Sequence, residues 1–176
     1  GGRHAALRVF VTGGADATRM ALLIEHPKRG GRQVVRPEGA HVSVDKACSW
    51  LGLHQVSAAL RPDGTVDVED VRERIGKQTT CIVGIAGTTE LGAVDDIPAL
   101  GALCRDLGVP LHVDAAWGGF VLPFARRLGR HFPAFDRAVP GVTSLALHPT
   151  NSARARIPPR ALVPAAPAEF DPLPVP

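Results

Sequence analysis

The sequence predicts an α/β fold in which helices flank a mostly parallel β-sheet. Strand-like and helix-like stretches alternate along the chain, and the helix-like ones are about ten residues long, which is typical of βαβ units. The run at 80–86 is apolar and β-branched, as expected for a strand covered on both faces. The crossovers between such strands should be right-handed.

Helices are expected where apolar residues recur at helical spacing. In the first helix Ala17, Met20 and Ile24 share one face, and the third helix begins with acidic residues. The three later helices are each followed by a glycine, which commonly ends a helix. The predicted helices cover residues 16–25, 43–51, 67–75 and 96–107.

Short apolar runs between these helices predict the strands. The pair Asp63-Gly64 indicates a turn before the third helix. The strands are expected at residues 33–36, 53–59, 80–86, 109–113 and 142–147.

The composition argues against several classes of function. The net charge of +3 comes from dispersed arginines, so no basic stripe indicates nucleic-acid binding. No apolar run approaches the roughly 18 residues of a membrane span, and the histidines show no metal-ligand spacing. The dispersed Cys48, Cys81 and Cys104 indicate reduced thiols. We therefore expect a cytoplasmic protein, without a secretory leader, that binds no metal, membrane or nucleic acid.

The composition changes near His148, and we divide the chain there. Residues 1–148 carry the alternating elements, whereas residues 149–176 contain eight of the 16 prolines. Proline at this density interrupts helices and strands. We expect 149–176 to be a Pro/Ala/Arg-rich tail that is either disordered or read in a shifted frame.

A lone carboxylate, Asp114, ends the predicted strand at 109–113. Open α/β sheets bind ligands at the carboxyl ends of their strands. The residues that follow are small (Ala115, Ala116, Gly118 and Gly119), so a flat ligand could lie against the backbone. A carboxylate in such a place suits a protonated ring nitrogen, such as that of pyridoxal phosphate. The alternative is an aspartate that caps a helix beginning near Ala115.

Three further segments fit a ligand that carries a ring and a phosphate. Gly13 and Gly14 precede the first helix, whose N-terminus would attract an anion. His41 follows the second strand and could stack on a ring, and Thr89 follows the buried strand. Each has an ordinary alternative: a plain glycine loop, a surface or cap histidine, and a solvated turn.

Four separated motifs resemble the group II pyridoxal-phosphate-dependent decarboxylases, in their tyrosine/aspartate decarboxylase branch. The matching segments are TGGADA at 12–17, AHVSVDKA at 40–47, IVGIAGTTELG at 82–92 and HVDAAWGGFVLPF at 112–124. The resemblance implies part of a fold type I large domain, like that of aspartate aminotransferase, over residues 1–148. It also implies pyridoxal phosphate as cofactor, an aromatic amino acid or aspartate/glutamate as substrate, and a homodimer.

The resemblance also implies roles for single residues. Gly14 and Ala15 would donate backbone hydrogen bonds to the cofactor phosphate, and Thr89 would lie near the ring hydroxyl and the substrate carboxylate.

Around the ring, His41 would stack on one face and Ala116 would pack against the other. Asp114 would keep the ring nitrogen protonated and so make the ring an electron sink. His41 and Asp114 are therefore the candidate catalytic residues.

One departure from the family motif affects the chemistry. The family pattern Ser-x-x-x-Asp-Pro-His-Lys corresponds to 144–151, where Asn151 takes the place of the lysine that binds the cofactor covalently. Thr150 takes the place of a phosphate-contacting histidine. We expect this chain not to turn over substrate. A frame slip near His148, a pseudoenzyme and a truncated product with a disordered tail all explain the change. The functional alternative is a non-catalytic module that binds the cofactor weakly or pairs with an intact homologue.

Overall fold

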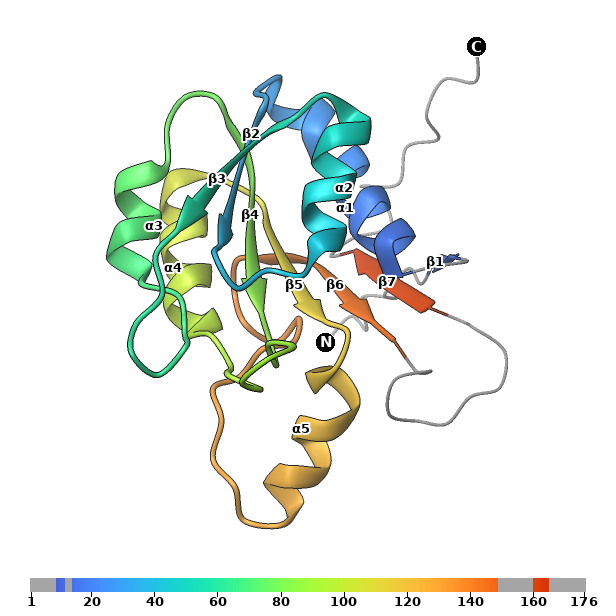
Figure 1. The fold of residues 1–176 in the computed structure, drawn as a ribbon, viewed down its shortest axis with the longest axis vertical. Coiled ribbons are helices and arrows are strands. Elements are labelled where there is room, and N and C mark those ends of the chain that lie inside the picture. Colours follow the sequence, from blue (N-terminus) through green and yellow to red (C-terminus); the bar gives the residue numbers. More distant parts are fainter. Residues whose placement is uncertain (1–8, 12–13, 149–159, 165–176) are drawn as a thin grey trace, which may run out of the picture.

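A computed structural model describes residues 9–11, 14–148 and 160–164. It contains one seven-stranded sheet with helices on both faces (Figure 1). The strands are β1 (Val9–Val11), β2 (Gln33–Pro37), β3 (His54–Ala58), β4 (Thr79–Ile85), β5 (Leu111–Ala115), β6 (Val142–Leu147) and β7 (Arg160–Pro164). The helices are α1 (Gly14–Arg29), α2 (Val42–Leu51), α3 (Val68–Arg74), α4 (Ile97–Leu107) and α5 (Gly118–Arg127).

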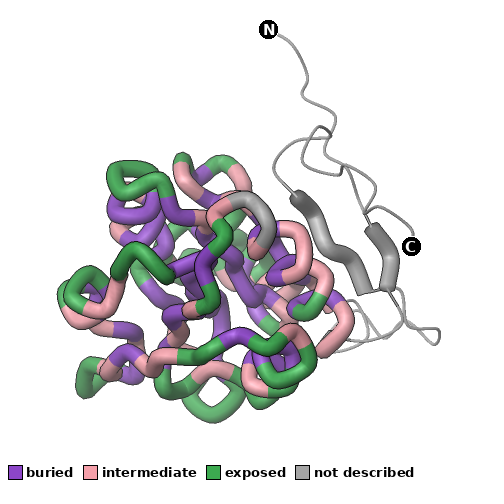
Figure 2. Tube along the Cα trace, turned by 90° about the horizontal axis from the view of Figure 1, so that it is seen from above, coloured by how far each residue is buried: buried purple, intermediate pink, exposed green. Residues whose placement is uncertain are grey.

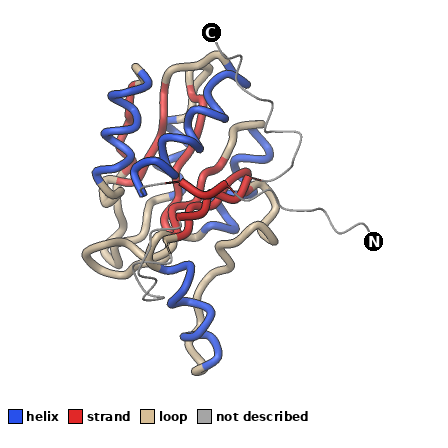
Figure 3. Tube along the Cα trace, turned by 90° about the vertical axis from the view of Figure 1, so that its right-hand side faces the viewer, coloured by secondary structure: helices blue, strands red, loops and turns tan. Residues whose placement is uncertain are grey.

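The strand order is β1-β7-β6-β5-β4-β2-β3. The five strands from β6 to β3 are parallel, and β7 is antiparallel to both of its neighbours. Successive residues of the central strands point to opposite faces, so Val34 packs under α1 and α2 while Val35 packs with α3 and α4. The sheet is the middle of three layers, and β2, β4, β5 and β6 are largely buried (Figures 2 and 3).

The predicted α/β fold with a mostly parallel sheet is confirmed. All five predicted strands and all four predicted helices are present, with their ends shifted by up to four residues. The strand expected at 109–113 occupies Leu111–Ala115, because Val109 still bonds back to the end of α4 through Cys104 O at 2.8 Å. Asp114 is therefore part of β5, one residue before the end of the strand. The sequence analysis missed β1, α5 and β7.

The prediction for residues 149–176 was wrong at one segment. We expected no strand after His148, yet Arg160–Pro164 forms β7 and pairs with β6 from Ser144↔Pro164 to Leu147↔Ala161. The edge of β6 presents unpaired backbone N–H and C=O groups, and residues 160–164 form a strand by hydrogen-bonding to them. Residues 149–159 and 165–176 lie outside the described residues, and the division of the chain at residue 148 stays a prediction.

Candidate active site

The strand connections reverse direction between β2 and β4. From β2 the chain passes through α2 to β3, whereas from β4 it passes through α4 to β5 on the other face of the sheet. In open α/β sheets such a switch point leaves a crevice at the carboxyl ends of the strands. The residues after β2, β4, β5 and β6 therefore converge on one edge of the sheet.

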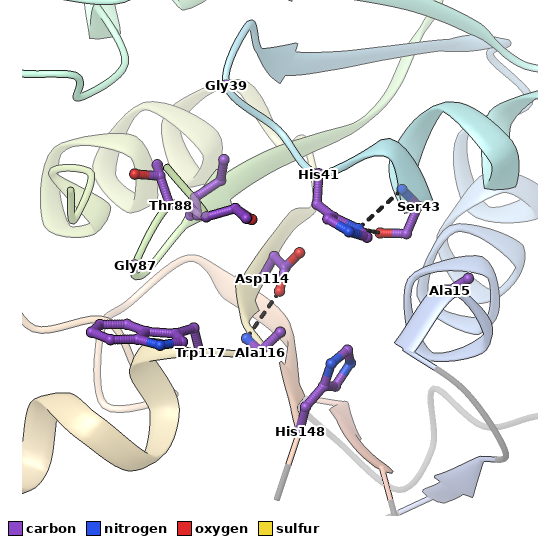
Figure 4. Close-up of a pocket in the computed structure, with 12 residues that line it drawn as sticks. Ala15, Gly39, His41, Ser43, Gly87, Thr88, Asp114, Ala116, Trp117 and His148 are labelled. Carbon is purple, nitrogen blue, oxygen red and sulfur yellow. Dashed lines mark hydrogen bonds between the residues drawn. The ribbon is translucent and has the colours of Figure 1, made fainter. Parts of the chain in front are cut away.

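A cavity of about 340 Å³ lies at this edge (Figure 4). Small-molecule pockets measure roughly 300–1,000 Å³. The wall combines residues from the ends of four strands with one residue from the start of α1. The lining residues are Ala15, Gly39, His41, Ser43, Ile85, Gly87, Thr88, Thr89, Asp114, Ala116, Trp117 and His148.

Asp114 presents one carboxylate oxygen to this cavity. The side chain is mostly buried, with 9% of its residue surface exposed. Its Oδ1 accepts a hydrogen bond from Ala116 N at 3.0 Å, whereas Oδ2 has no hydrogen-bond partner among the described residues. The helix-cap alternative is wrong, because α5 begins at Gly118 and its cap residue Trp117 makes no side-chain cap bond.

His41 caps a helix, as one of its two alternatives had it, and it also lines the cavity. Its Nδ1 accepts from Ser43 N at 3.2 Å at the start of α2, and it lies 3.0 Å from Ser43 Oγ. A nitrogen that accepts a backbone N–H carries no proton, so the proton of the neutral ring is on Nε2. These bonds fix the orientation of the imidazole beside the cavity (Figure 4).

A buried imidazole lies two residues before Asp114 on the same face of β5. His112 is fully buried, and its Nδ1 is 2.8 Å from Ser144 Oγ on β6. Burial lowers the pKa of His112 to about 4, although the nearby Asp114 carboxylate raises it. The ring is therefore neutral near pH 7, and Asp114 has no cationic partner beneath it in the sheet.

We call residues 86–94, which follow β4, the site loop. An antiparallel bridge from Ala86 to Val94 closes it, and Ala93 N donates to Thr88 Oγ1 at 3.0 Å. Gly87 has a φ of 100°, and a Cβ there would lie 2.8 Å from Trp117 Cε3. Only glycine suits both conditions. Thr89 is left exposed at the mouth, between this cavity and an adjoining one of about 400 Å³ that it also lines.

The N-terminus of α1 reaches the cavity through Ala15. Gly14 is the first residue of this helix, so the orphan N–H groups of the first turn lie at this end. Asp16 in the same turn forms a salt bridge with Arg19 at 3.1 Å, which offsets its negative charge. This end of α1 therefore remains favourable for an anion.

The structure brings five predicted site residues together around one cavity: Ala15, His41, Thr89, Asp114 and Ala116. Thr150 and Asn151 lie outside the described residues. Sequence reasoning assigned no role to several other lining residues, and their only signal was a place next to a predicted one at a strand end. They are Gly39, Ser43, Ile85, Gly87, Trp117 and His148.

Two other findings concern the part of the chain that the structure describes. None of its helices has the length and apolar character needed to cross a membrane. Within the same residues, no three His, Cys, Asp or Glu side chains are grouped as a metal site.

Known proteins resemble this chain in both sequence and structure. The probable L-aspartate decarboxylase of Pyrococcus furiosus is 47% identical over 156 residues, which are 85% of this chain and 41% of that protein. The probable L-tyrosine/L-aspartate decarboxylase of Methanothermobacter thermautotrophicus is 41% identical over 151 residues, 85% of this chain and 42% of that protein. The sphingosine-1-phosphate lyase of Burkholderia pseudomallei superposes with a TM-score of 0.90 and 29% identity, covering 96% of this chain and 40% of that one.

The chain thus spans about two fifths of the length of the curated relatives it matches. The sequence profile of the pyridoxal-dependent decarboxylase conserved domain matches residues 31–156. This range contains β2 to β6, all the strand ends around the cavity and the Asp114 segment. The chain belongs to the pyridoxal-dependent decarboxylase family, whose cofactor is pyridoxal phosphate.

Proposed function

We propose that this chain is the cofactor-binding core of an amino-acid decarboxylase and that its cavity holds pyridoxal phosphate. The observation that carries the proposal is the free Oδ2 of Asp114 in a cavity edged by His41 and by the start of α1. Asp114 is largely buried while this oxygen faces the cavity, so a ligand N–H placed there would form a charge-assisted hydrogen bond with it.

The residues present fit this cofactor. The cavity is large enough for a ring with a phosphate arm, and Asp114 Oδ2 offers an acceptor to a ring N–H. Gly118 keeps the end of β5 close to the site loop, because a Cβ there would lie 2.0 Å from Ala86 O. The start of α1, with Gly14 and Ala15, offers backbone N–H groups to the phosphate.

When bound, pyridoxal phosphate supplies an electron sink for the negative charge left on the substrate carbon by loss of CO₂. Asp114 would hold the proton of the ring nitrogen through Oδ2, and its bond from Ala116 N fixes the carboxylate plane. His41 would stack on the ring, with Ser43 fixing its orientation, and Ala116 would pack against the opposite ring face. Thr89 lies at the mouth and would bind the ring hydroxyl or the substrate carboxylate.

The chain as written lacks the lysine that would bind the cofactor covalently. Asn151 stands at that position of the motif, and an amide does not form an imine with an aldehyde. We propose that the chain binds pyridoxal phosphate reversibly and does not turn over substrate. Asn151 equally favours the second candidate function, a non-catalytic module that binds the cofactor weakly or pairs with an intact homologue.

A titration with pyridoxal phosphate tests the proposal. We expect saturable quenching of tryptophan fluorescence, because Trp117 lines the cavity. Asp114→Asn keeps an acceptor for Ala116 N but loses the charge, so the dissociation constant should rise roughly 10- to 100-fold, as for a lost charged hydrogen bond. Asp106→Asn, at an exposed aspartate on α4, is the matched control and should leave the constant within about twofold.

A second variant tests the missing lysine. In the unaltered chain, borohydride should fix no cofactor to position 151, and gel filtration should remove the absorbance. Asn151→Lys should give a visible absorbance band and a borohydride-stable adduct on that lysine, seen by peptide mass spectrometry. Equal binding by the unaltered chain and Asp114→Asn would contradict the assignment of the site.

The remaining proposals concern the whole protein. We propose an aromatic amino acid or aspartate/glutamate as the substrate, in line with relatives described as L-aspartate and L-tyrosine/L-aspartate decarboxylases. We also propose a cytoplasmic homodimer. The free, buried Cys48, Cys81 and Cys104 support a reducing compartment. The exposed Phe124 on α5 and Leu128 directly after it support a further protein surface against that helix, which sedimentation analysis can test.

A further inference from the structure

One buried carboxylate lies behind the site loop and outside the cavity. Asp95 is only 1% exposed, and no arginine, lysine or histidine is paired with it among the described residues. Its two carboxylate oxygens each accept one backbone N–H. Oδ1 accepts from Val66 N at 2.8 Å, and Oδ2 accepts from Ile85 N at 2.8 Å.

These bonds join three segments that lie apart in the sequence: the end of β4, the end of the site loop, and the segment that contains Val66. Ile85 is the last residue of β4, and Asp95 follows the site loop directly and also donates its own N–H to Ile85 O at 2.9 Å. Val66 belongs to the segment 60–66, which we call the hairpin because Leu60 and Val66 form an antiparallel bridge. Asp95 therefore holds together the two ends of the site loop, which we call its neck. It also links this neck to the hairpin.

The hairpin also touches the site loop directly. Gly64 is buried at the hairpin turn, and a Cβ there would lie 2.5 Å from Leu91 Cδ1 and 3.6 Å from Ala93 Cβ. The hairpin thus backs the part of the loop that follows Thr89. A movement of the neck at Asp95 would shift Thr88 and Thr89 relative to the cavity.

We propose that Asp95 is a positioning residue that couples the hairpin to the site loop and so sets the place of Thr88 and Thr89 in the cofactor site. This inference rests on the proposed function for its ligand, but the geometry is that of the chain itself. Asp95 does not line the cavity, and it acts through the backbone of the loop.

A carboxylate is needed here because both of its oxygens are acceptors. Burial raises the pKa of Asp95 to about 6, with Asp63 on the hairpin adding to the rise and the two N–H donors opposing it. An asparagine has one acceptor oxygen, and its NH₂ group faces a donor, so one of the two backbone N–H groups loses its partner. A neutral hydrophobic residue would lose both.

The test compares Asp95→Asn with Asp96→Asn in the full 176-residue chain. Asp96 is the adjacent, exposed aspartate that caps α4 through Ala99 N, and asparagine caps helices equally well. Hydrogen–deuterium exchange of single amides is measured first, without ligand. We expect at least tenfold faster exchange across the site loop in Asp95→Asn, and unchanged exchange in α2 and in Asp96→Asn.

The cofactor affinity gives the second readout. The dissociation constant of pyridoxal phosphate should rise about tenfold in Asp95→Asn and stay within about twofold in Asp96→Asn. Faster loop exchange with an unchanged constant would leave Asp95 a purely structural residue and overturn the proposal, as would unchanged loop exchange. If neither the unaltered chain nor Asp96→Asn binds the cofactor, the proposed function fails, while the exchange comparison still decides the positioning role.

A measurement on the unaltered chain covers the case in which Asp95→Asn does not fold. Val66 N lies outside the cavity and is linked to the site loop through Asp95 Oδ1. Saturation with pyridoxal phosphate should slow exchange of the Val66 amide several-fold. An unchanged Val66 amide alongside slowed loop amides would overturn the coupling.

Discussion

Gly118 allows the backbones after β4 and β5 to meet, and replacing it with alanine should open the cavity. Gly118 N donates to Ala86 O at 3.1 Å, so the start of α5 is bonded to the neck of the site loop. A Cβ at Gly118 would lie 2.0 Å from Ala86 O and 2.8 Å from Leu122 Cδ1. The first of these neighbours is backbone, and it cannot move without the strand end that carries it.

The magnitude follows from the two interactions that change. Relieving a contact at 2.0 Å needs a backbone shift of more than an ångström, and overpacking of this kind costs roughly 1–3 kcal/mol. The bond from Gly118 N to Ala86 O contributes about 1 kcal/mol more. We therefore expect Gly118→Ala to lower the free energy of unfolding by about 2–4 kcal/mol.

The neighbouring glycine is the control. A Cβ at Gly119 would meet Leu147 Cδ2 at 2.2 Å, which is the end of a flexible side chain. Leu147 can change rotamer, and alanine is favoured over glycine inside a helix by up to about 1 kcal/mol. Gly119→Ala should therefore stay within about 1 kcal/mol of the unaltered chain.

Urea unfolding followed by far-ultraviolet circular dichroism measures both variants. With a slope of about 2 kcal/mol per molar urea, Gly118→Ala should shift the midpoint down by about 1–2 M. Its affinity for pyridoxal phosphate should fall as well, because the site loop moves away from the end of β5. Equal midpoints for the two alanine variants would refute the steric argument.

Two further predictions concern buried titrating groups. Burial raises the pKa of Cys48 to about 11 and that of Cys104 to about 12, and it also raises the pKa of Cys81. A disulfide reagent at pH 8 should therefore label none of the three thiols in the folded chain and all three in urea. The raised pKa of Asp95, about 6, gives stability that is full below about pH 4 and lost as the pH rises through 6. The lowered pKa of His112, about 4, gives stability that is present above pH 6.5 and lost as the pH falls. Asp95→Asn leaves the contribution of His112, so between pH 4 and 6 its unfolding free energy should rise with pH. His112→Gln leaves the contribution of Asp95, so its unfolding free energy should fall with pH over the same range. Slopes of the same sign in both variants would contradict these pKa shifts.

Sequence patterns located the elements whose signals are local. The run in β4 is buried at every position, and the glycines at 52 and 108 end α2 and α4 in the left-handed conformation. At Gly76 the prediction was slightly off, because α3 ends at Arg74 and its cap residue Ile75, which precedes the glycine, is already extended.

The missed elements depend on partners that are distant in the chain. Helix α5 begins with two glycines and contains Pro123, which are unfavourable for a helix, so no local pattern indicated it. Strand β7 lies among prolines and becomes a strand because the edge of β6 is available for pairing. The sequence of each segment alone therefore does not indicate that it forms a helix or a strand.

The site shows the same division between what is local and what is not. Asp114 lies near the end of β5, and His41 and Thr89 come shortly after β2 and β4. The rule that ligands bind at the carboxyl ends of parallel strands was enough to group them. Asp95 stands beside Asp96 in the sequence, and both fit the pattern of an acidic helix start. Only the fold distinguishes them, because the strand end at Ile85 and the hairpin at Val66 leave two N–H groups that a single carboxylate satisfies. Residues that touch a ligand can thus be found from strand ends, whereas residues that hold the loop in place require the backbone hydrogen bonds of the folded chain.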